Sequence, residues 1–216
     1  MVDRLTSVAQ AIGAVNTIFL RNGELVGDNT DAPGFLADLE QVFPADGRPV
    51  GRDRLAIVLG AGGAARAVVY ALAQDGWRIH IAARRLSQAQ ELAAIVAQGA
   101  TTSSLDAPSL GGPAQLAILV VNTTPVGMAP LVGDCPWPAG LPLPSKAFVY
   151  DLVYAPAETA LMRLAHGNGH QAASGLGMLI EQAALAFEAW TGRDADREAM
   201  RQAVDLEPIQ SSTGEG

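Results

Sequence analysis

The chain has 216 residues, which is enough for one large domain or two small ones. Its 22 Asp and Glu residues outnumber its 14 Lys and Arg residues, and the resulting net charge of −8 argues against binding to the phosphates of a nucleic acid. Hydrophobic residues make up 49% of the chain, which argues against general disorder. The single cysteine, Cys135, excludes an internal disulfide.

Three further classes of protein are disfavoured by the sequence. No apolar run approaches the roughly 18 residues of a membrane span. The first residues lack the basic region and apolar stretch of a secretory signal. His166 and His170 have a spacing that can suit a metal, but Gly167 and Gly169 interrupt the helix between them, and we predict no metal site. We expect a cytoplasmic protein that binds neither nucleic acid nor a membrane.

The first elements along the chain are a hairpin and a helix. Strand-forming residues on both sides of Asn22-Gly23 predict a β-hairpin over residues 14–27, because this pair suits a tight turn with positive φ. Residues 28–31 (Asp-Asn-Thr-Asp) offer several helix-capping side chains. Apolar residues then recur on one face of a helix: Phe35, Leu36, Leu39 and Val42. Residues 44–53 are polar and rich in turn formers, and we expect a loop there.

From residue 54 onward, strands and helices alternate. Short apolar runs predict buried strands over residues 55–59, 78–82, 116–121 and 148–153. Helices are expected from the glycines after residue 59 to about Ala73, from a capping Ser87 to about Ala97, over residues 159–165 and over residues 175–190. Residues 99–114 and the proline-rich residues 125–146 are interpreted as irregular. This alternation predicts an α/β fold with a Rossmann-like, doubly wound parallel sheet.

The strongest local motif is the glycine-rich turn that follows the strand over residues 55–59. It reads Gly60-Ala61-Gly62-Gly63-Ala64 and leads directly into a helix. Glycines at these positions let the backbone approach a pyrophosphate, and the helix N-terminus offers free N–H groups and positive potential. We interpret the motif as a dinucleotide-binding turn; the alternative is a tight strand–helix turn that binds no ligand.

The end of the next strand indicates which dinucleotide is bound. Proteins that bind NAD usually have an acidic residue here, which accepts a hydrogen bond from the ribose 2′-hydroxyl. This chain instead has Arg84 and Arg85, and arginine suits the 2′-phosphate of NADP. The alternative is a solvated pair of cations at a strand end. We predict that NADP is the cofactor.

Together the motifs identify a family. The chain resembles shikimate dehydrogenase over most of residues 9–192. The matching stretches, in the order of the family, are IGAVNTI (residues 12–18), GDNTD (27–31), GAGGAAR (60–66), VNTTPVGM (121–128), YDLVY (150–154) and GLGMLIEQAA (175–184). The resemblance implies an oxidoreductase that reversibly reduces 3-dehydroshikimate to shikimate with NADPH, in the pathway to chorismate and the aromatic amino acids.

The resemblance also implies roles for individual residues. The aspartate that acts with a lysine at the reacting hydroxyl matches Asp31. Residues that hold the substrate match Asn16, Asp31, Tyr154 and Gln182. Residues beside the cofactor, in addition to the glycine-rich turn and the two arginines, match Asn122, Thr123, Gly175 and Met178. Without the family, Asp31 would be interpreted first as a helix cap, while Asn16 could equally be a turn residue and Gln182 a solvated helix position.

Two departures from the family pattern shape the remaining expectations. Where the family has Asn-Arg-Thr, this chain has Ala83-Arg84-Arg85. The family's Pro-x-Lys segment, which carries the catalytic lysine, does not precede Ile12. We therefore expect an amino-terminally truncated member that turns over shikimate poorly by itself. The expected parts are a remnant of the α/β substrate-binding domain (1–31), the NADP-binding domain (32–175), C-terminal helices that return to the substrate domain (176–206) and a disordered tail (207–216).

Two other functions stay open at this point. One is a quinate/shikimate dehydrogenase that uses NAD, against which Arg84 argues because it stands where an acidic residue is expected. The other is an NADP-binding module or pseudoenzyme without catalytic activity. The partner we expect is the small-molecule substrate, and the chain is expected to be a monomer or a homodimer.

Overall fold

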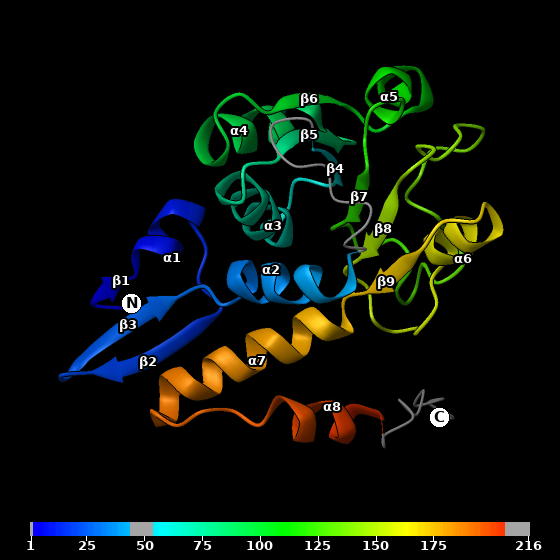
Figure 1. The fold of residues 1–216 in the computed structure, drawn as a ribbon. Coiled ribbons are helices and arrows are strands. Elements are labelled where there is room, and N and C mark those ends of the chain that lie inside the picture. The colour runs from blue at the N-terminus through cyan, green and yellow to red at the C-terminus, as the bar shows by residue number, and fades with distance from the viewer. Residues whose placement is uncertain (1, 44–53, 206–216) are drawn as a thin grey trace, which may run out of the picture.

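A six-stranded parallel sheet forms the larger part of the protein (Figure 1). The computed structural model describes residues 2–43 and 54–205. The strands, in their order across the sheet, are β6 (Thr101–Ser104), β5 (Arg78–Ala83), β4 (Leu55–Leu59), β7 (Leu119–Asn122), β8 (Phe148–Asp151) and β9 (Ala172–Ser174). All neighbouring strands pair in parallel. The predicted doubly wound α/β fold is confirmed.

Helices cover both faces of this sheet because its central strands are apolar on both faces. Along β4, Ala56 and Val58 pack on one side, while Ile57 and Leu59 pack on the other. The first face is covered by α2 (Asp31–Val42), α3 (Gly63–Gln74) and α4 (Leu86–Val96). The second face is covered by α5 (Ala107–Ala114) and α6 (Ala160–Gly167). Each face thus has its own buried cluster.

A small three-stranded sheet precedes the large one. The predicted hairpin is present as β2 (Thr17–Arg21) and β3 (Glu24–Asp28), which pair in antiparallel register. Asn22 and Gly23 have φ values of 54° and 83°, as the tight turn requires. A third strand, β1 (Arg4–Leu5), pairs in parallel with β3, and the connection from β1 to β2 contains α1 (Ser7–Ile12). The sequence analysis did not predict β1.

Helix α2 joins the two sheets, since it follows β3 and packs between α3 and α7 (Leu176–Thr191) (Figure 1). It buries Phe35 and Leu39, with the other two predicted apolar residues partly buried. Glycines allow α2 and α7 to approach closely. A β-carbon at Gly34 would lie 2.9 Å from the backbone nitrogen of Gln182, and a β-carbon at Gly177 would overlap the carboxylate of Asp38.

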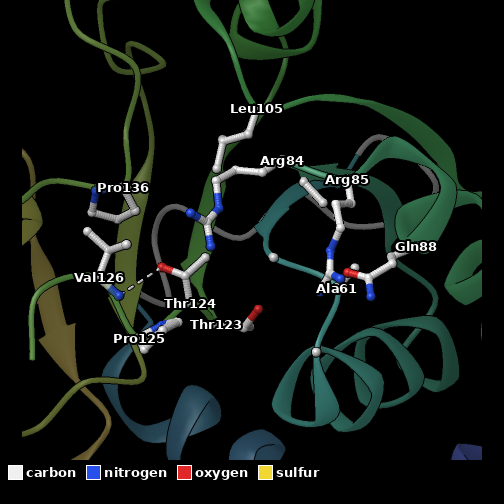
Figure 2. A pocket seen from close by; sticks show the side chains of 13 residues that line it. Ala61, Arg84, Arg85, Gln88, Leu105, Thr123, Thr124, Pro125, Val126 and Pro136 are labelled. Carbon is white, nitrogen blue, oxygen red and sulfur yellow. Dashed lines mark hydrogen bonds between the residues drawn. The ribbon is translucent and has the colours of Figure 1, made fainter.

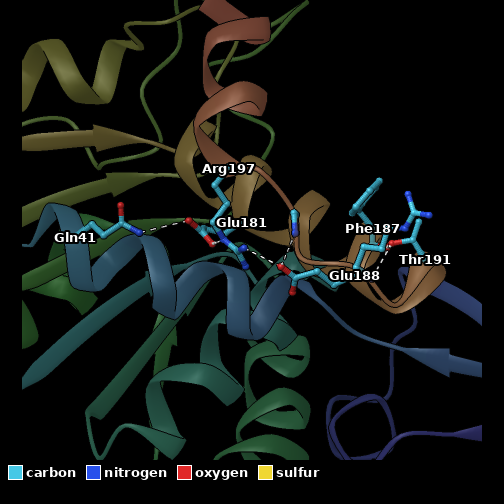
Figure 3. Close-up of polar contacts among 8 residues, drawn as sticks. Gln41, Glu181, Phe187, Glu188, Thr191 and Arg197 are labelled. Carbon is cyan, nitrogen blue, oxygen red and sulfur yellow. Dashed lines mark hydrogen bonds and ion pairs between the residues drawn. The ribbon is translucent and has the colours of Figure 1, made fainter.

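The last helix, α8 (Arg197–Asp205), is held to α7 by ion pairs (Figure 3). Arg197 Nε lies 2.7 Å from Glu181 Oε2, and its Nη1 lies 2.8 Å from Glu188 Oε1. Glu181 is only 4% exposed and also accepts a 3.4 Å hydrogen bond from Gln41 Nε2 of α2. Since a buried carboxylate needs a partner, Arg197 provides the positive charge that its burial requires.

Two expectations from the sequence were wrong. Residues 99–114 are not irregular, because they contain β6 and α5. Helix α5 begins after Asp106, whose carboxylate caps Ser109 N, and it buries Leu110. Ser87 does not cap α4: the N-cap is Arg85, without a side-chain hydrogen bond, and Ser87 lies inside the first turn.

Two further expectations concern residues that the structure does not describe. The expected loop over residues 44–53 and the tail over residues 207–216 both lie outside the described residues. Within the described ranges, no helix combines the length and apolar character that crossing a membrane requires.

The contact between Gly177 and Asp38 can be tested by mutation. A methyl group at Gly177 would overlap the Asp38 carboxylate, so we expect Gly177→Ala to lower the free energy of unfolding by about 1–3 kcal/mol. Gly111→Ala in α5 is the matched control, because a β-carbon there would meet nothing within 4 Å. The control should be neutral or stabilising by up to about 1 kcal/mol. Urea denaturation measures both, and equal stability changes would contradict the packing described.

Candidate functional site

The glycine-rich turn after β4 leaves the start of α3 open. Gly60 has a φ of 109°, and a β-carbon there would lie 2.7 Å from Thr123 Oγ1. Gly62 is the N-cap of α3 and offers no side-chain hydrogen bond to the first turn. A β-carbon at Gly62 or Gly63 would meet nothing within 4 Å. The first N–H groups of α3 therefore have no capping side chain, and the space above them suits an anion.

A pocket lies beside this turn at the carboxyl edge of the parallel sheet (Figure 2). It is lined by Gly60, Ala61, Gly62, Ala83, Arg84, Arg85, Gln88, Leu105, Thr123, Thr124, Pro125, Val126 and Pro136. Arg84 extends toward Thr124, and Arg85 runs beside Gln88 toward Ala61. Both arginines are exposed, and neither forms an ion pair with a described carboxylate. With no acidic residue in this lining, the pocket favours a ligand with several negative charges.

A second, mostly apolar pocket meets the first at residues 123–125. Its other lining residues are Ala64, Met128, Leu152, Val153, Tyr154 and Ala155. Ala64 lies in the first turn of α3, and Tyr154 is 43% exposed. The two pockets together offer a charged part and an apolar part on the same edge of the sheet, which suits a ligand with phosphates and a flat ring.

Asn122 shapes the loop between the two pockets and does not line either of them. Its side chain is buried, and Nδ2 donates to Asp151 Oδ1 at 2.8 Å and to the Val126 carbonyl at 3.1 Å. Its Oδ1 accepts from the backbone and hydroxyl of Thr124. Asp151 also accepts a 2.6 Å hydrogen bond from Thr159, while burial raises its pKa. This network fixes the backbone that carries the pocket wall.

Asn16 and Asp31 form a second polar cluster, at the start of α2. Asn16 Nδ2 donates to Asp31 Oδ1 at 2.8 Å and to Thr30 Oγ1 at 3.0 Å. Asn16 Oδ1 accepts from the Thr30 backbone at 2.9 Å. Burial raises the pKa of Asp31, and the hydrogen bond from Asn16 opposes this rise. The side chain that caps the first turn of α2 belongs to Asn29, whose Oδ1 accepts from Ala32 N at 3.2 Å. Asp31 itself is therefore not needed as the cap.

The remaining predicted residues lie around the first turns of α7. Gln182 contacts α2 at Gly34, one turn after Asp31, so these two predicted substrate residues are close in the fold. Gly175 is required because a β-carbon there would overlap the Leu152 carbonyl. Met178 is buried. Gly175 thus lies behind the wall of the second pocket, and neither Gly175 nor Met178 lines that pocket.

Several pocket residues were missed by the sequence analysis. Thr124, Pro125 and Val126 lie in a stretch that carried the family resemblance, so their position could have been proposed. Gln88 follows the two arginines in the first turn of α4, and Leu105 follows β6 in a segment that was expected to be irregular. Gln88 and Leu105 reach the pocket only through the tertiary structure, which the sequence pattern does not show. In the described part of the chain, no group of three or more His, Cys, Asp or Glu residues could hold a metal.

Comparisons with known proteins agree with this geometry. A family model described as the Shikimate 5′-dehydrogenase C-terminal domain matches residues 175–204. A shikimate dehydrogenase (NADP(+)) of Salinibacter ruber is 43% identical over 212 residues, which cover 94% of this chain and 72% of that protein. The corresponding protein of Methylobacterium radiotolerans is 47% identical over 197 residues, covering 89% of this chain and 67% of that protein.

A solved structure shares the fold over the same range. The crystal structure of shikimate 5-dehydrogenase from Thermus thermophilus, in complex with NADP(H) and shikimate, superposes with a TM-score of 0.80. The sequence identity is 40%, and the match covers 94% of this chain and 72% of that one. The similarity therefore extends across both sheets described above.

The electrostatics of Asp31 predict how stability depends on pH. Because its pKa in the folded protein is raised above the ordinary 3.8, the folded state loses stability as this carboxyl ionises. This loss of stability is absent at pH values below the pKa of Asp31 in the unfolded chain. It is complete at pH values above the pKa of Asp31 in the folded protein. Asp31→Asn keeps an oxygen acceptor for Asn16 and removes the charge. We expect the variant to gain stability relative to the original protein as the pH rises above about 4, the ordinary pKa of an aspartate, in urea denaturation. A difference that is independent of pH would contradict this.

Proposed function

The chain belongs to the shikimate dehydrogenase family, and from that membership we propose that it binds NADP(H) and acts in the reversible reduction of 3-dehydroshikimate to shikimate. The observation that carries the proposal is the pocket beside the glycine-rich turn, where two arginines without a described carboxylate partner accompany an open helix N-terminus. The named relatives are NADP-dependent shikimate dehydrogenases, and their similarity covers 89% and 94% of the chain.

The residues of the first pocket fit the phosphates of NADP. The open space at Gly62 and Gly63 leaves room for the pyrophosphate against the first N–H groups of α3. Arg84 and Arg85 would hold the 2′-phosphate, because a guanidinium matches a phosphate in charge and in hydrogen-bonding geometry. Bound NADP(H) supplies the hydride acceptor or donor. The adjoining apolar pocket, with Tyr154 in its lining, suits the nicotinamide end.

The substrate half of the proposal rests on the polar cluster at the start of α2. A polyol acid such as shikimate needs several fixed donors and acceptors, since unpaired buried polar groups are costly. Asn16, Asp31 and Gln182 supply amides and a carboxylate from neighbouring elements. Asp31 would hold the reacting hydroxyl and exchange a proton with its oxygen, and its raised pKa brings it closer to the range in which such exchange is efficient.

Lys146 is the only lysine of the sequence and does not share this site. It precedes β8 and lies with His170 at the amino edge of the parallel sheet. The glycine-rich turn follows β4 at the opposite edge. In our proposal, Lys146 therefore takes no part in the reaction.

We also propose that the protein is cytoplasmic and forms a homodimer. A cytoplasmic location agrees with the use of a single cysteine, since secreted domains of this kind often carry disulfides and this chain has no second cysteine to form one. A homodimer is supported by exposed apolar side chains on β2 and β3, including Ile18, Leu20 and Leu25, whereas a monomer would leave them in water.

The choice of cofactor gives a direct test. We expect NADP(H) to bind more tightly than NAD(H), and Arg84→Ala/Arg85→Ala to remove most of that preference. Each hydrogen bond from a charged group to the 2′-phosphate can contribute about 1.5–3 kcal/mol. Calorimetric titration with both cofactors measures the preference. The control is Arg78→Ala, which removes an arginine from the opposite end of β5 and should leave the preference unchanged. Equal affinities in the unmodified protein would refute the NADP assignment.

The role of Asp31 is tested by turnover. In a version of the protein that carries the family's lysine segment, we expect Asp31→Asn to lower the rate of NADP-dependent shikimate oxidation about 10²- to 10⁴-fold, as loss of a general acid–base does. NADP(H) affinity should change little, because Asp31 lies on α2 and does not line the cofactor pocket. Asp106→Asn is the control, since asparagine also caps a helix. Near-normal turnover in Asp31→Asn would mean that the carboxylate serves structure alone.

A further inference from the structure

A buried hydrogen bond joins α2 to β8 against the first turn of α7, and none of the roles described above uses it. Asp38 of α2 is 2% exposed, and its Oδ2 accepts a 2.6 Å hydrogen bond from the hydroxyl of Tyr150. Tyr150 lies on β8 and is itself completely buried. Burial raises the pKa of the Tyr150 hydroxyl, and the backbone N–H of Met178, in the first turn of α7, opposes this rise. The hydroxyl therefore joins β8 to α2, beside the first turn of α7.

The second oxygen of Asp38 faces the same turn of α7. It occupies the space that a β-carbon at Gly177 would take. The N-cap of α7, Gly175, offers no side-chain hydrogen bond, so a carboxylate here meets the positive end of a helix that no side chain caps. Burial raises the pKa of Asp38, while Tyr150 and the Arg201 charge oppose the rise. A buried carboxylate at this point lowers the stability of the fold. The contacts of Asp38 lie around the start of α7.

The start of α7 supports the wall of the apolar pocket. Gly175 lies against the Leu152 carbonyl with no room for a side chain. Leu152 and Tyr154 line the pocket that, in the proposed function, receives the nicotinamide end. A displacement of the first turn of α7 would therefore move this wall directly. The glycine-rich turn and the two arginines belong to other elements and would stay in place.

Asp38 also connects this wall to the substrate residues. Asp31 and Asp38 are seven residues apart in α2, which places them on the same face two turns from each other. Anchoring Asp38 to β8 and α7 therefore sets where the Asp31 carboxylate lies relative to the apolar pocket. A hydride transfer requires such placement to be accurate.

We propose that Asp38, acting through the Tyr150 hydroxyl, is a positioning residue that holds the first turn of α7 and fixes the nicotinamide wall relative to Asp31. This inference rests on the proposed function, because it takes the apolar pocket as the nicotinamide site. It predicts that the network affects the nicotinamide end of the cofactor and leaves the phosphate end unaffected.

The experiment compares two ligands in calorimetric titration: NADPH, and 2′-phospho-ADP-ribose, which is the same molecule without the nicotinamide. The unmodified protein should bind NADPH more tightly. In Tyr150→Phe, which deletes only the bridging hydroxyl, the affinity ratio of the two ligands should fall about 3- to 10-fold. Asp38→Asn keeps an oxygen acceptor and loses the charge, and its ratio should fall about threefold. The affinity for 2′-phospho-ADP-ribose should stay within about twofold in both variants.

Tyr70→Phe, which deletes a hydroxyl from α3, is the matched control and should keep the original ratio. Unchanged ratios in both Tyr150→Phe and Asp38→Asn would overturn the inference. So would an equal loss of affinity for both ligands, because this would show a general loss of structure. If the unmodified protein bound 2′-phospho-ADP-ribose no better than ADP-ribose, the proposed NADP function would fail instead, which distinguishes the two results.

Discussion

The close approach of α2 and α7 is the constraint on which the arrangement of the site depends. Gly34 and Gly177 leave no room for side chains, so the two helices meet almost backbone to backbone. The Asp38 carboxylate fills the remaining space and is bound by Tyr150 of the parallel sheet. Because α2 begins at Asp31 and α7 carries Gln182, this one contact places two of the predicted substrate residues relative to each other. It also ties them to the sheet that bears the cofactor pocket.

The protein keeps two buried carboxyl groups, Asp38 and Asp151, and the partly buried carboxyl of Asp31 in and around the site at a cost in stability. Burial raises the pKa of Asp31, Asp38 and Asp151, and in each case hydrogen bonds oppose only part of the rise. Apolar residues of similar size would pack at lower cost in a region that served stability alone. The hydrogen bonds of these groups have definite directions, and they fix loops and helix ends that apolar contacts would leave less defined.

The parts of the fold that the sequence predicted have strong local signals. Asn22-Gly23 specifies a turn by its backbone preference, and the apolar run of β4 is typical of a strand buried on both faces. Strand β6 has no such signal, because it is a polar edge strand. Two of its hydroxyls, on Thr101 and Ser103, bind the buried His80 of β5 at 2.8 and 2.9 Å. Helix α5 contains two glycines and two prolines and depends on burial of Leu110, which is a tertiary effect.

The residues of the site also divide into those with a local sequence signal and those that depend on tertiary contacts. The sequence predicted the glycines and arginines that line the pocket beside β4, because close backbone approach and phosphate binding require those residue types. The role of Asp38 could not be identified, since its partner Tyr150 is 112 residues away in the chain. Asn122 matches the cofactor loop by resemblance, whereas its side chain is occupied entirely by internal hydrogen bonds.

The central claim is that the α2–α7 contact makes α2 part of the same cooperative unit as the cofactor sheet. Native-state hydrogen exchange at increasing urea concentration tests it most directly. The backbone amides of α2 between Phe35 and Leu39 should open with the same free energy as those of β4, since both lie in one buried cluster. The hairpin β2–β3, which leaves Ile18, Leu20 and Leu25 exposed, should open at lower free energy and serves as the internal reference. Exchange of the α2 amides together with the hairpin, well before β4, would contradict the claim.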